Sequence, residues 1–263
     1  MRMMLAALIV ACFCIPAQAQ VTANVLNRVV QVRSPAGSCS AFTIEVEDKQ
    51  YLVTARHCLK GPNDASGLEV QQGVAWKPID GPAYFPLNTD VDIAAIALPE
   101  RLTVAFEFQP TSDGIAMGQQ VYFLGFPSGL STKWTSSGVS EFSEVAFIKA
   151  GILSAMDSRN PQSVVLYVDG HNNSGFSGGP IVFRPSPNLP FRVAAVVKGF
   201  RNEFTPVVKR ESLKDQNASA YEDLYTRANS GIIVGHSIDH IVKAITDAEK
   251  GKRVEKRRVA CSR

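Results

Sequence analysis

Short apolar segments rich in β-branched residues alternate with turn-forming residues along most of this 263-residue chain. Stretches that contain Pro and Gly separate them, for example at 34–37 and 60–64. Short apolar runs bounded in this way are typical of β-strands. The sequence therefore predicts an all-β fold with strands at Val29–Val32, Phe42–Val46, Tyr51–Ala55, Leu68–Gln71, Ile93–Leu98, Val121–Leu124, Trp134–Val139, Val145–Ile152, Val164–Val168, Ile181–Phe183, Val193–Val197 and Ile232–Val234.

The predicted strands fall into two blocks, at about 25–100 and about 104–235, which favours two small barrels packed side by side. Helical periodicity is found only at the end of the chain, where Ser237 can cap a helix over 237–249. Its apolar face would consist of Ile238, Ile241, Val242 and Ile245. The polar stretch 201–229 has no clear period, and we interpret it as an extended surface loop.

The first 19 residues have the pattern of an export signal. Arg2 is a minimal basic region, 5–15 is an apolar core, and Ala17-Gln18-Ala19 is a small-residue cleavage site. We expect cleavage near Ala19 and a soluble product that is secreted or periplasmic. No apolar run is long enough to predict a membrane span. A lipid-attachment box at 9–12 is the alternative interpretation.

The charge of the chain is nearly balanced, with a formal net charge of +3. Such a balance does not suit a nucleic-acid-binding protein. The basic excess is local to residues 250–263, which we interpret as a solvated, disordered tail or as an anchor to an anionic surface. Its basic residues are Lys250, Lys252, Arg253, Lys256, Arg257, Arg258 and Arg263.

Three cysteines remain after removal of the signal segment: Cys39, Cys58 and Cys261. Export permits a disulfide. A bridge between Cys39 and Cys58 would fix the segment around His57, because Cys58 directly follows that histidine. Cys261 is then left over, either as a free thiol or as a partner for another chain.

Ser177 lies among glycines in the run Asn173-Ser174-Gly175-Phe176-Ser177-Gly178-Gly179-Pro180. Glycine has no Cβ, so this run permits a sharp turn that points backbone N–H groups at a substrate carbonyl. The N–H groups of Gly175 and Ser177 would form an oxyanion hole, in which one donor is typically worth about 3 kcal/mol of barrier. The alternatives are a turn that merely contains a serine, and the nucleophile elbow of an α/β-hydrolase. The elbow requires alternating strands and helices, which the sequence before Ser177 lacks.

A serine hydroxyl needs an imidazole to take its proton and a carboxylate to orient that imidazole. His57 and Asp92 precede Ser177 and supply both groups. The runs Thr54-Ala55-x-His57-Cys58, Asp92-Ile93-Ala94 and Gly175-x-Ser177-Gly178-Gly179-Pro180 resemble the three motifs of the chymotrypsin-like (trypsin-like) serine proteases, in that family's order. The runs at 118–127 and Asp169 resemble its bacterial exported branch.

This resemblance implies two six-stranded antiparallel β-barrels with a C-terminal helix, in one protease domain over 20–249. It also implies hydrolysis of peptide bonds through an acyl-enzyme. His57 would act as general base and then acid, Asp92 would orient it, and Ser177 would attack. Substrate would lie extended against Val197, Lys198 and Gly199.

The chain departs from the family's pattern at several positions. Phe176 stands where digestive relatives carry an aspartate that pairs with a newly freed N-terminus, so activation by that ion pair is not expected. His171 stands where trypsin proper binds basic side chains with an acidic residue, and Val197 where glutamate-specific relatives use a histidine. Lys198 would favour acidic side chains in substrates. No room is left for a PDZ module.

The sequence therefore predicts an exported serine endopeptidase that acts on proteins or peptides. The alternative is a binding protein of the same fold that has lost catalysis. No cofactor motif is found, and the histidines His57, His171, His236 and His240 lack the spacing of a metal site, with the last two expected at the surface. The oligomeric state stays open.

Overall fold

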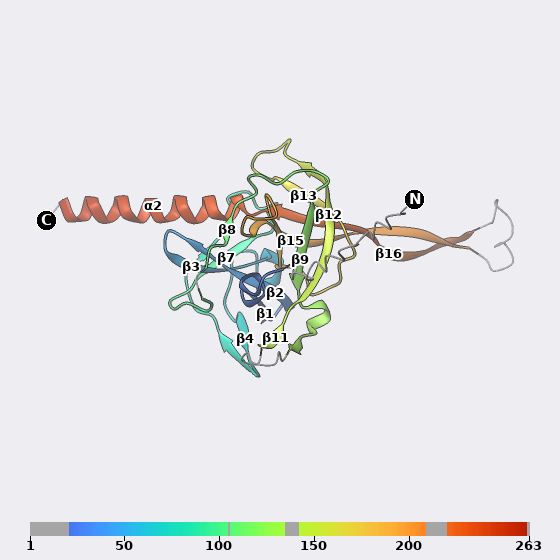
Figure 1. Ribbon diagram of the computed structural model, residues 1–263, viewed down its shortest axis with the longest axis horizontal. Coiled ribbons are helices and arrows are strands. Elements are labelled where there is room, and N and C mark those ends of the chain that lie inside the picture. Colours follow the sequence, from blue (N-terminus) through green and yellow to red (C-terminus); the bar gives the residue numbers. More distant parts are fainter. Residues whose placement is uncertain (1–20, 105, 135–141, 209–219, 262–263) are drawn as a thin grey trace, which may run out of the picture.

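The computed structural model describes residues 21–104, 106–134, 142–208 and 220–261. Within these residues the fold is all-β, with two seven-stranded sheets and one long C-terminal helix (Figure 1). The predicted fold class is confirmed. The signal segment 1–19 and most of the strand predicted at 134–139 lie outside the described residues.

The first sheet is formed by strands of the N-terminal half of the chain. Its spatial order is β5 (Ala75–Pro78), β4 (Glu69–Gln72), β1 (Val29–Ser34), β2 (Gly37–Val46), β3 (Lys49–Thr54), β7 (Ala94–Ala97) and β6 (Ala83–Tyr84). A short helix α1 (Ala23–Asn27) precedes it. Strands β1, β2, β3 and β7 are antiparallel neighbours, and their buried side chains form the apolar interior of this half.

The second sheet closes on itself. Its order is β14 (Pro180–Phe183), β9 (Gln120–Gly125), β12 (Phe147–Asp157), β13 (Val165–Asp169), β16 (Ala220–Ser237), β15 (Arg192–Val208) and β8 (Gln109–Pro110). Because β14 also pairs with β15, six of these strands form a ring, while β8 adds in parallel at the outside. A separate ribbon joins β10 (Thr132–Trp134) to β11 (Phe142–Val145).

Another apolar cluster joins the two sheets. It includes Phe42 and Val53 from the first sheet and Leu124 and Val196 from the second. Helix α2 (Asp239–Cys261) contributes Ile241 and Ile245 to this cluster, and Ile238, directly before the helix, also belongs to it. All three side chains are fully buried. The predicted apolar face of the C-terminal helix is thus confirmed, and it fastens the end of the chain across both halves.

Two elements differ from the sequence-based expectation. Helix α2 continues to Cys261, through the segment interpreted as a disordered tail. That segment is rich in Lys and Arg, which are good helix formers and favourable near a helix C-terminus, and it contains no proline.

The described parts of the stretch interpreted as a loop, 201–208 and 220–229, belong instead to a long antiparallel ribbon of β15 and β16, which is paired from Ala195↔Ser237 out to Val208↔Ala220. Figure 1 shows this ribbon and α2 extending from opposite sides of the molecule. The ladder of backbone hydrogen bonds forms here although side chains such as Phe204 and Tyr225 remain 64% and 57% exposed.

Candidate active site

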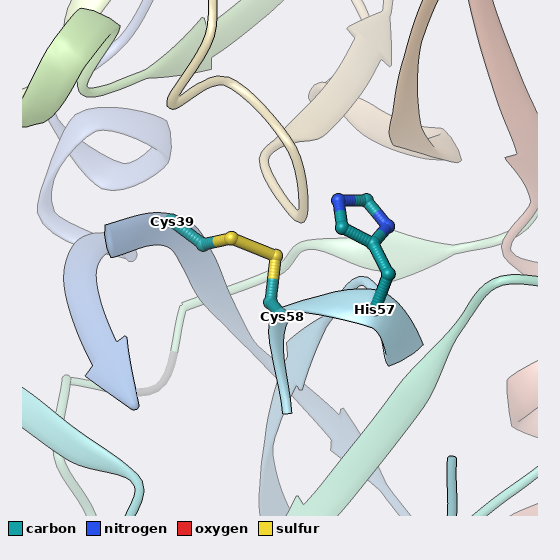
Figure 2. A group of neighbouring side chains, drawn as sticks. All are labelled: Cys39, His57 and Cys58. Carbon is teal, nitrogen blue, oxygen red and sulfur yellow. A yellow bond between two sulfur atoms is a disulfide. The ribbon is translucent and has the colours of Figure 1, made fainter. Parts of the chain in front are cut away.

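His57 lies in a single 3₁₀ turn, Arg56–Cys58, that directly follows β3. The structure contains the predicted disulfide between Cys58 in this turn and Cys39 in β2, which ties the turn to the neighbouring strand. Figure 2 shows the imidazole beside the bridge. The sulfur and nitrogen atoms of Cys39, Cys58 and His57 lie within 4.8 Å of one another. Because the two sulfurs are bonded to each other, neither is a thiolate that could bind a metal ion.

Asp92 holds His57 by two hydrogen bonds. Its Oδ2 lies 2.6 Å from Nδ1 of the ring, and its Oδ1 accepts the backbone N–H of His57 at 2.9 Å. This pairing fixes the ring and leaves Nε2 free to meet another group. Asp90, two residues earlier, is exposed and makes no such contact.

The charge of Asp92 is stabilised by its partner. Burial raises the pKa of this carboxyl, but the hydrogen bonds from the ring and backbone of His57 and the charges of His57 and Lys198 outweigh burial. The pKa of Asp92 therefore lies below its ordinary value. At neutral pH the side chain is a carboxylate that can stabilise an imidazolium.

Ser177 lies in a tight turn between β13 and β14, which we call the nucleophile turn (residues 173–179). Gly175 and Gly178 have positive φ angles of 100° and 83°. A Cβ on Gly178 would lie 2.1 Å from the carbonyl oxygen of Ser40, and one on Gly175 would lie 2.1 Å from that of Phe126. Only glycine fits these two positions.

The nucleophile turn presents two backbone donors. Within the described part of the chain, no acceptor contacts the N–H of Gly175 or that of Ser177. These are the two N–H groups that the sequence analysis assigns to an oxyanion hole. Phe176, between them, is fully buried and packs edge to face on Phe123, with ring centroids 5.4 Å apart. The turn is anchored by apolar packing at the position where digestive relatives use an ion pair.

The hydroxyl of Ser177 does not point at His57 in this structure. Its Oγ donates to the carbonyl oxygen of Lys198 at 3.1 Å, and the described residues show no hydrogen bond between Ser177 and His57. The two residues are nevertheless close, because Sγ of Cys58 lies 3.9 Å from the carbonyl oxygen of Ser177. A serine–histidine hydrogen bond would require the Ser177 side chain to leave the carbonyl of Lys198.

The segment predicted to bind substrate divides into a buried and an exposed part. Val197 is fully buried, and its carbonyl and N–H are used by Gly178 and Gly179. It therefore belongs to the barrel wall. Lys198 and Gly199 line a cavity of about 560 Å³ together with His57 and Asp92, which we call the Asp92 cavity. These two residues remain available to a substrate.

His171 lines a second cavity, of about 440 Å³, which borders the nucleophile turn. We call it the Arg227 cavity. Its lining consists of Ser128, His171, Asn172, Asn173, Ser174, Phe200, Asn202, Arg227, Ala228 and Asn229. Lys198, which the sequence analysis connected with acidic substrates, lines the Asp92 cavity instead. The contribution of Arg227 could not be found from sequence, because it depends on the β15/β16 ribbon.

Two histidines expected at the surface are not exposed. His236 in β16 is 3% exposed, and neither of its ring nitrogens has a partner among the described residues. Burial, aided by the charge of Lys198, lowers the pKa of His236 to about 4, so the ring is neutral at physiological pH. His240 is half-buried, and its Nε2 accepts the N–H of Val164 at 2.8 Å. His236 was misplaced because it lies inside β16, which has a paired strand on each edge, and His240 because it packs back against Val164.

Comparison with known proteins places this arrangement in a family. The family described as "Trypsin-like peptidase domain" matches residues 39–184. No match was found among curated proteins. No helix of the described residues is long and apolar enough to cross a membrane.

Solved structures of the same fold include an inactive form of the Rv3671c protease from Mycobacterium tuberculosis. Its TM-score is 0.51 at 15% identity, and the alignment covers 85% of this chain and 89% of that one. The scabies mite inactivated protease paralogue S-I1 has a TM-score of 0.52 at 14% identity, with 85% of this chain and 95% of that chain covered. At such identities the likeness shows the fold, and the family match over residues 39–184 shows that this chain belongs to the trypsin-like peptidase family.

Proposed function

We propose that this protein is an exported serine endopeptidase in which Ser177 is the nucleophile, His57 the general base and acid, and Asp92 the group that orients the histidine. The observation that carries the proposal is the pair of hydrogen bonds that Asp92 accepts from His57, beside a turn with two N–H groups that have no acceptor among the described residues. An imidazole held by a carboxylate, close to a serine hydroxyl and two amide donors, supplies the parts of a nucleophilic hydrolase.

The reaction follows from this geometry. Oγ of Ser177 attacks the scissile carbonyl carbon while Nε2 of His57 takes the hydroxyl proton, and the N–H groups of Gly175 and Ser177 stabilise the oxyanion. His57 then gives the proton to the leaving amine as the C–N bond breaks, which leaves an ester on Ser177. Water, deprotonated by His57, hydrolyses that ester and restores the serine.

A substrate has to displace one contact before this chemistry begins. The bond from Ser177 Oγ to the carbonyl of Lys198 holds the hydroxyl away from His57. That bond is the observation in favour of the second candidate function, a binding protein of the trypsin fold without catalysis. The unobstructed glycine turn and the Asp92–His57 pair favour the endopeptidase.

Substitution of Asp92 tests the endopeptidase proposal. Asp92→Asn should lower the rate of peptide hydrolysis on the order of 10⁴-fold, because an amide neither fixes the required tautomer nor stabilises the imidazolium. The matched control is Asp90→Asn, which changes an exposed acid two residues away and should leave the rate within about twofold. The measurement is cleavage of an unfolded protein substrate by the mature chain, with Ser177→Ala as the blank. Equal effects of the two asparagine variants would remove Asp92 from the mechanism.

Export is a separate part of the proposal. The basic, apolar and small-residue pattern of 1–19 supports it, and the Cys39–Cys58 disulfide fits an oxidising compartment. N-terminal sequencing of the protein recovered outside the cytoplasm should begin near residue 20. An intact N-terminus, or a lipid on Cys12, would contradict cleavage at Ala19.

A further inference from the structure

The Arg227 cavity lies where the side chain next to a scissile bond would be placed. Residues 171–174 form one wall and lead into the nucleophile turn. Ser128 lines the cavity beside them, and its N–H donates to the carbonyl of Ser174 at 2.7 Å. The opposite wall begins at Phe200, two residues after the Lys198 carbonyl that accepts from Ser177. The rest of the lining comes from the part of the β15/β16 ribbon nearest the barrel, at Asn202 and 227–229.

Two amide oxygens of this cavity already accept a hydrogen bond. Oδ1 of Asn172 accepts the N–H of Asn173, and Oδ1 of Asn229 accepts that of Gly231. Nδ2 of Asn172 is buried in the wall without a partner among the described residues. A ligand with acceptor oxygens would therefore fit the lining better than a ligand with donors.

The charge of the cavity is positive. Its lining contains no aspartate or glutamate, and Arg227 is exposed, with no ion pair among the described residues. Behind the wall, Nζ of Lys149 donates to the carbonyl of His171 and to Oδ1 of Asn173. A guanidinium that is open to the cavity can bind a carboxylate by two parallel hydrogen bonds.

We propose that the Arg227 cavity selects substrates with an aspartate or glutamate at the residue that provides the scissile carbonyl, and that Arg227 binds its carboxylate. This inference rests on the proposed endopeptidase function and adds its substrate class.

The adjoining Asp92 cavity also contains more basic than acidic side chains. It is lined by Lys198 and Arg201, and of the described residues around it Asp92 alone is acidic. The carboxylate of Asp92 is already bonded to His57. Acidic side chains of a substrate thus meet cationic residues in both cavities: Arg227 in one, and Lys198 and Arg201 in the other.

The first test measures kcat/KM for matched peptide anilides that differ only in the residue before the scissile bond: Glu, Gln, Leu or Lys. A charge-assisted pair of this kind is worth about 1.5–3 kcal/mol, which corresponds to roughly ten- to a hundredfold. We expect glutamate to exceed glutamine and leucine by that factor, and lysine to be hydrolysed slowest. A profile led by lysine, or equal rates for all four, would overturn the proposal.

The second test moves the charge. Arg227→Glu should reverse the order of the glutamate and lysine substrates, and Arg227→Gln should only remove the preference. The control is Lys77→Glu, an exposed residue of β5 that changes the net charge equally and should keep the wild-type order. An unchanged order in a folded Arg227→Glu variant would show that another group determines the specificity.

The third test separates the cavity from the chemistry. Binding of the uncleaved glutamate, glutamine, leucine and lysine peptides to Ser177→Ala is measured by calorimetry, which requires no turnover. If Ser177→Ala binds the peptides in the predicted order but the wild type cleaves none of them, the cavity is supported and the endopeptidase is refuted. If the wild type cleaves all four peptides equally and Ser177→Ala binds them equally, the endopeptidase is supported and the cavity proposal is refuted.

Discussion

Ser40 is the residue that connects the two sheets at the nucleophile turn. Its Oγ donates to the carbonyl of Gly175 at 2.7 Å and accepts the N–H of Phe126 at 2.9 Å. Its backbone N–H donates to the carbonyl of Ser177, and its carbonyl accepts the hydroxyl of Thr54 at 2.8 Å. A fully buried serine in β2 of the first sheet thus orients the turn of the second.

Ser40→Ala should therefore weaken both stability and reactivity. The substitution leaves the buried N–H of Phe126 and the carbonyl of Gly175 without this partner, which costs about 1–3 kcal/mol. Denaturant unfolding measures the loss, and the rate of acylation by an active-site probe measures the disturbance of the turn. Ser158→Ala, at an exposed position whose hydroxyl has no hydrogen bond among the described residues, should change neither. Matching values for the two variants would show that Ser40 does not position the turn.

At the scale of single residues, the sequence predicted the features that depend on short local motifs. The pairing of His57 with Asp92 and the tight glycine turn both follow from short runs of residues. Arg227 and Ser40 carry no such signal, because their roles depend on register between segments far apart in the chain. The burial of Val197 could not be predicted either, because the pattern locates the strand but not which of its side chains face the interior.

At the scale of elements, helix α2 is fastened to the first sheet by a polar contact as well as by its apolar face. Oε2 of Glu249 lies 2.6 Å from Nζ of Lys49, and Oε1 lies 2.7 Å from the hydroxyl of Tyr84 and 2.9 Å from Nζ of Lys252. The hydrogen bonds from Lys49, Lys252 and Tyr84 lower the pKa of Glu249 to about 2. The carboxylate of this residue is 9% exposed.

Because this pKa lies below the value of 4.5 of an unperturbed glutamate, the stabilisation is fully present above about pH 4.5 and is lost as pH falls toward 2. Glu249→Gln should lower the free energy of unfolding by about 2 kcal/mol near neutral pH. The difference from the wild type should shrink over pH 4.5 to 2 in a series of denaturant titrations.

Asp247→Asn is the control on the same helix. Asp247 pairs with Lys243 at 2.7 Å in an exposed position, where such a pair contributes little. A Glu249→Gln variant that is as stable as this control, or whose deficit grows on acidification, would contradict the proposed anchoring of α2.

Two elements were not predicted from the sequence: the C-terminal part of α2 and the outer part of the β15/β16 ribbon. The apolar face of α2 up to Ile245 was predicted because burial imposes a period, whereas the sequence of the helix beyond Glu249 has no apolar period. The outer part of the β15/β16 ribbon likewise has no buried face, and its strands follow from pairing with each other. Periodicity detects burial, so it could not reveal these two extensions.

At the scale of the whole molecule, the proposed site exists only where the two halves meet. The N-terminal half contributes His57, Asp92 and Ser40, and the second half contributes the nucleophile turn and the part of β15 that lines both cavities. The shared apolar cluster and α2 hold the halves together. Loosening that junction would separate the histidine from the serine without changing either residue.

The central claim is that Ser177 is a nucleophile activated by His57. The measurement is reaction of the folded, mature protein with a fluorophosphonate probe, followed by mass-spectrometric location of the adduct in the wild type, Ser177→Ala and His57→Ala. The account predicts one adduct, on Ser177, that is lost in both variants. A folded wild-type protein that takes up no probe, or that is labelled equally without His57, would contradict it.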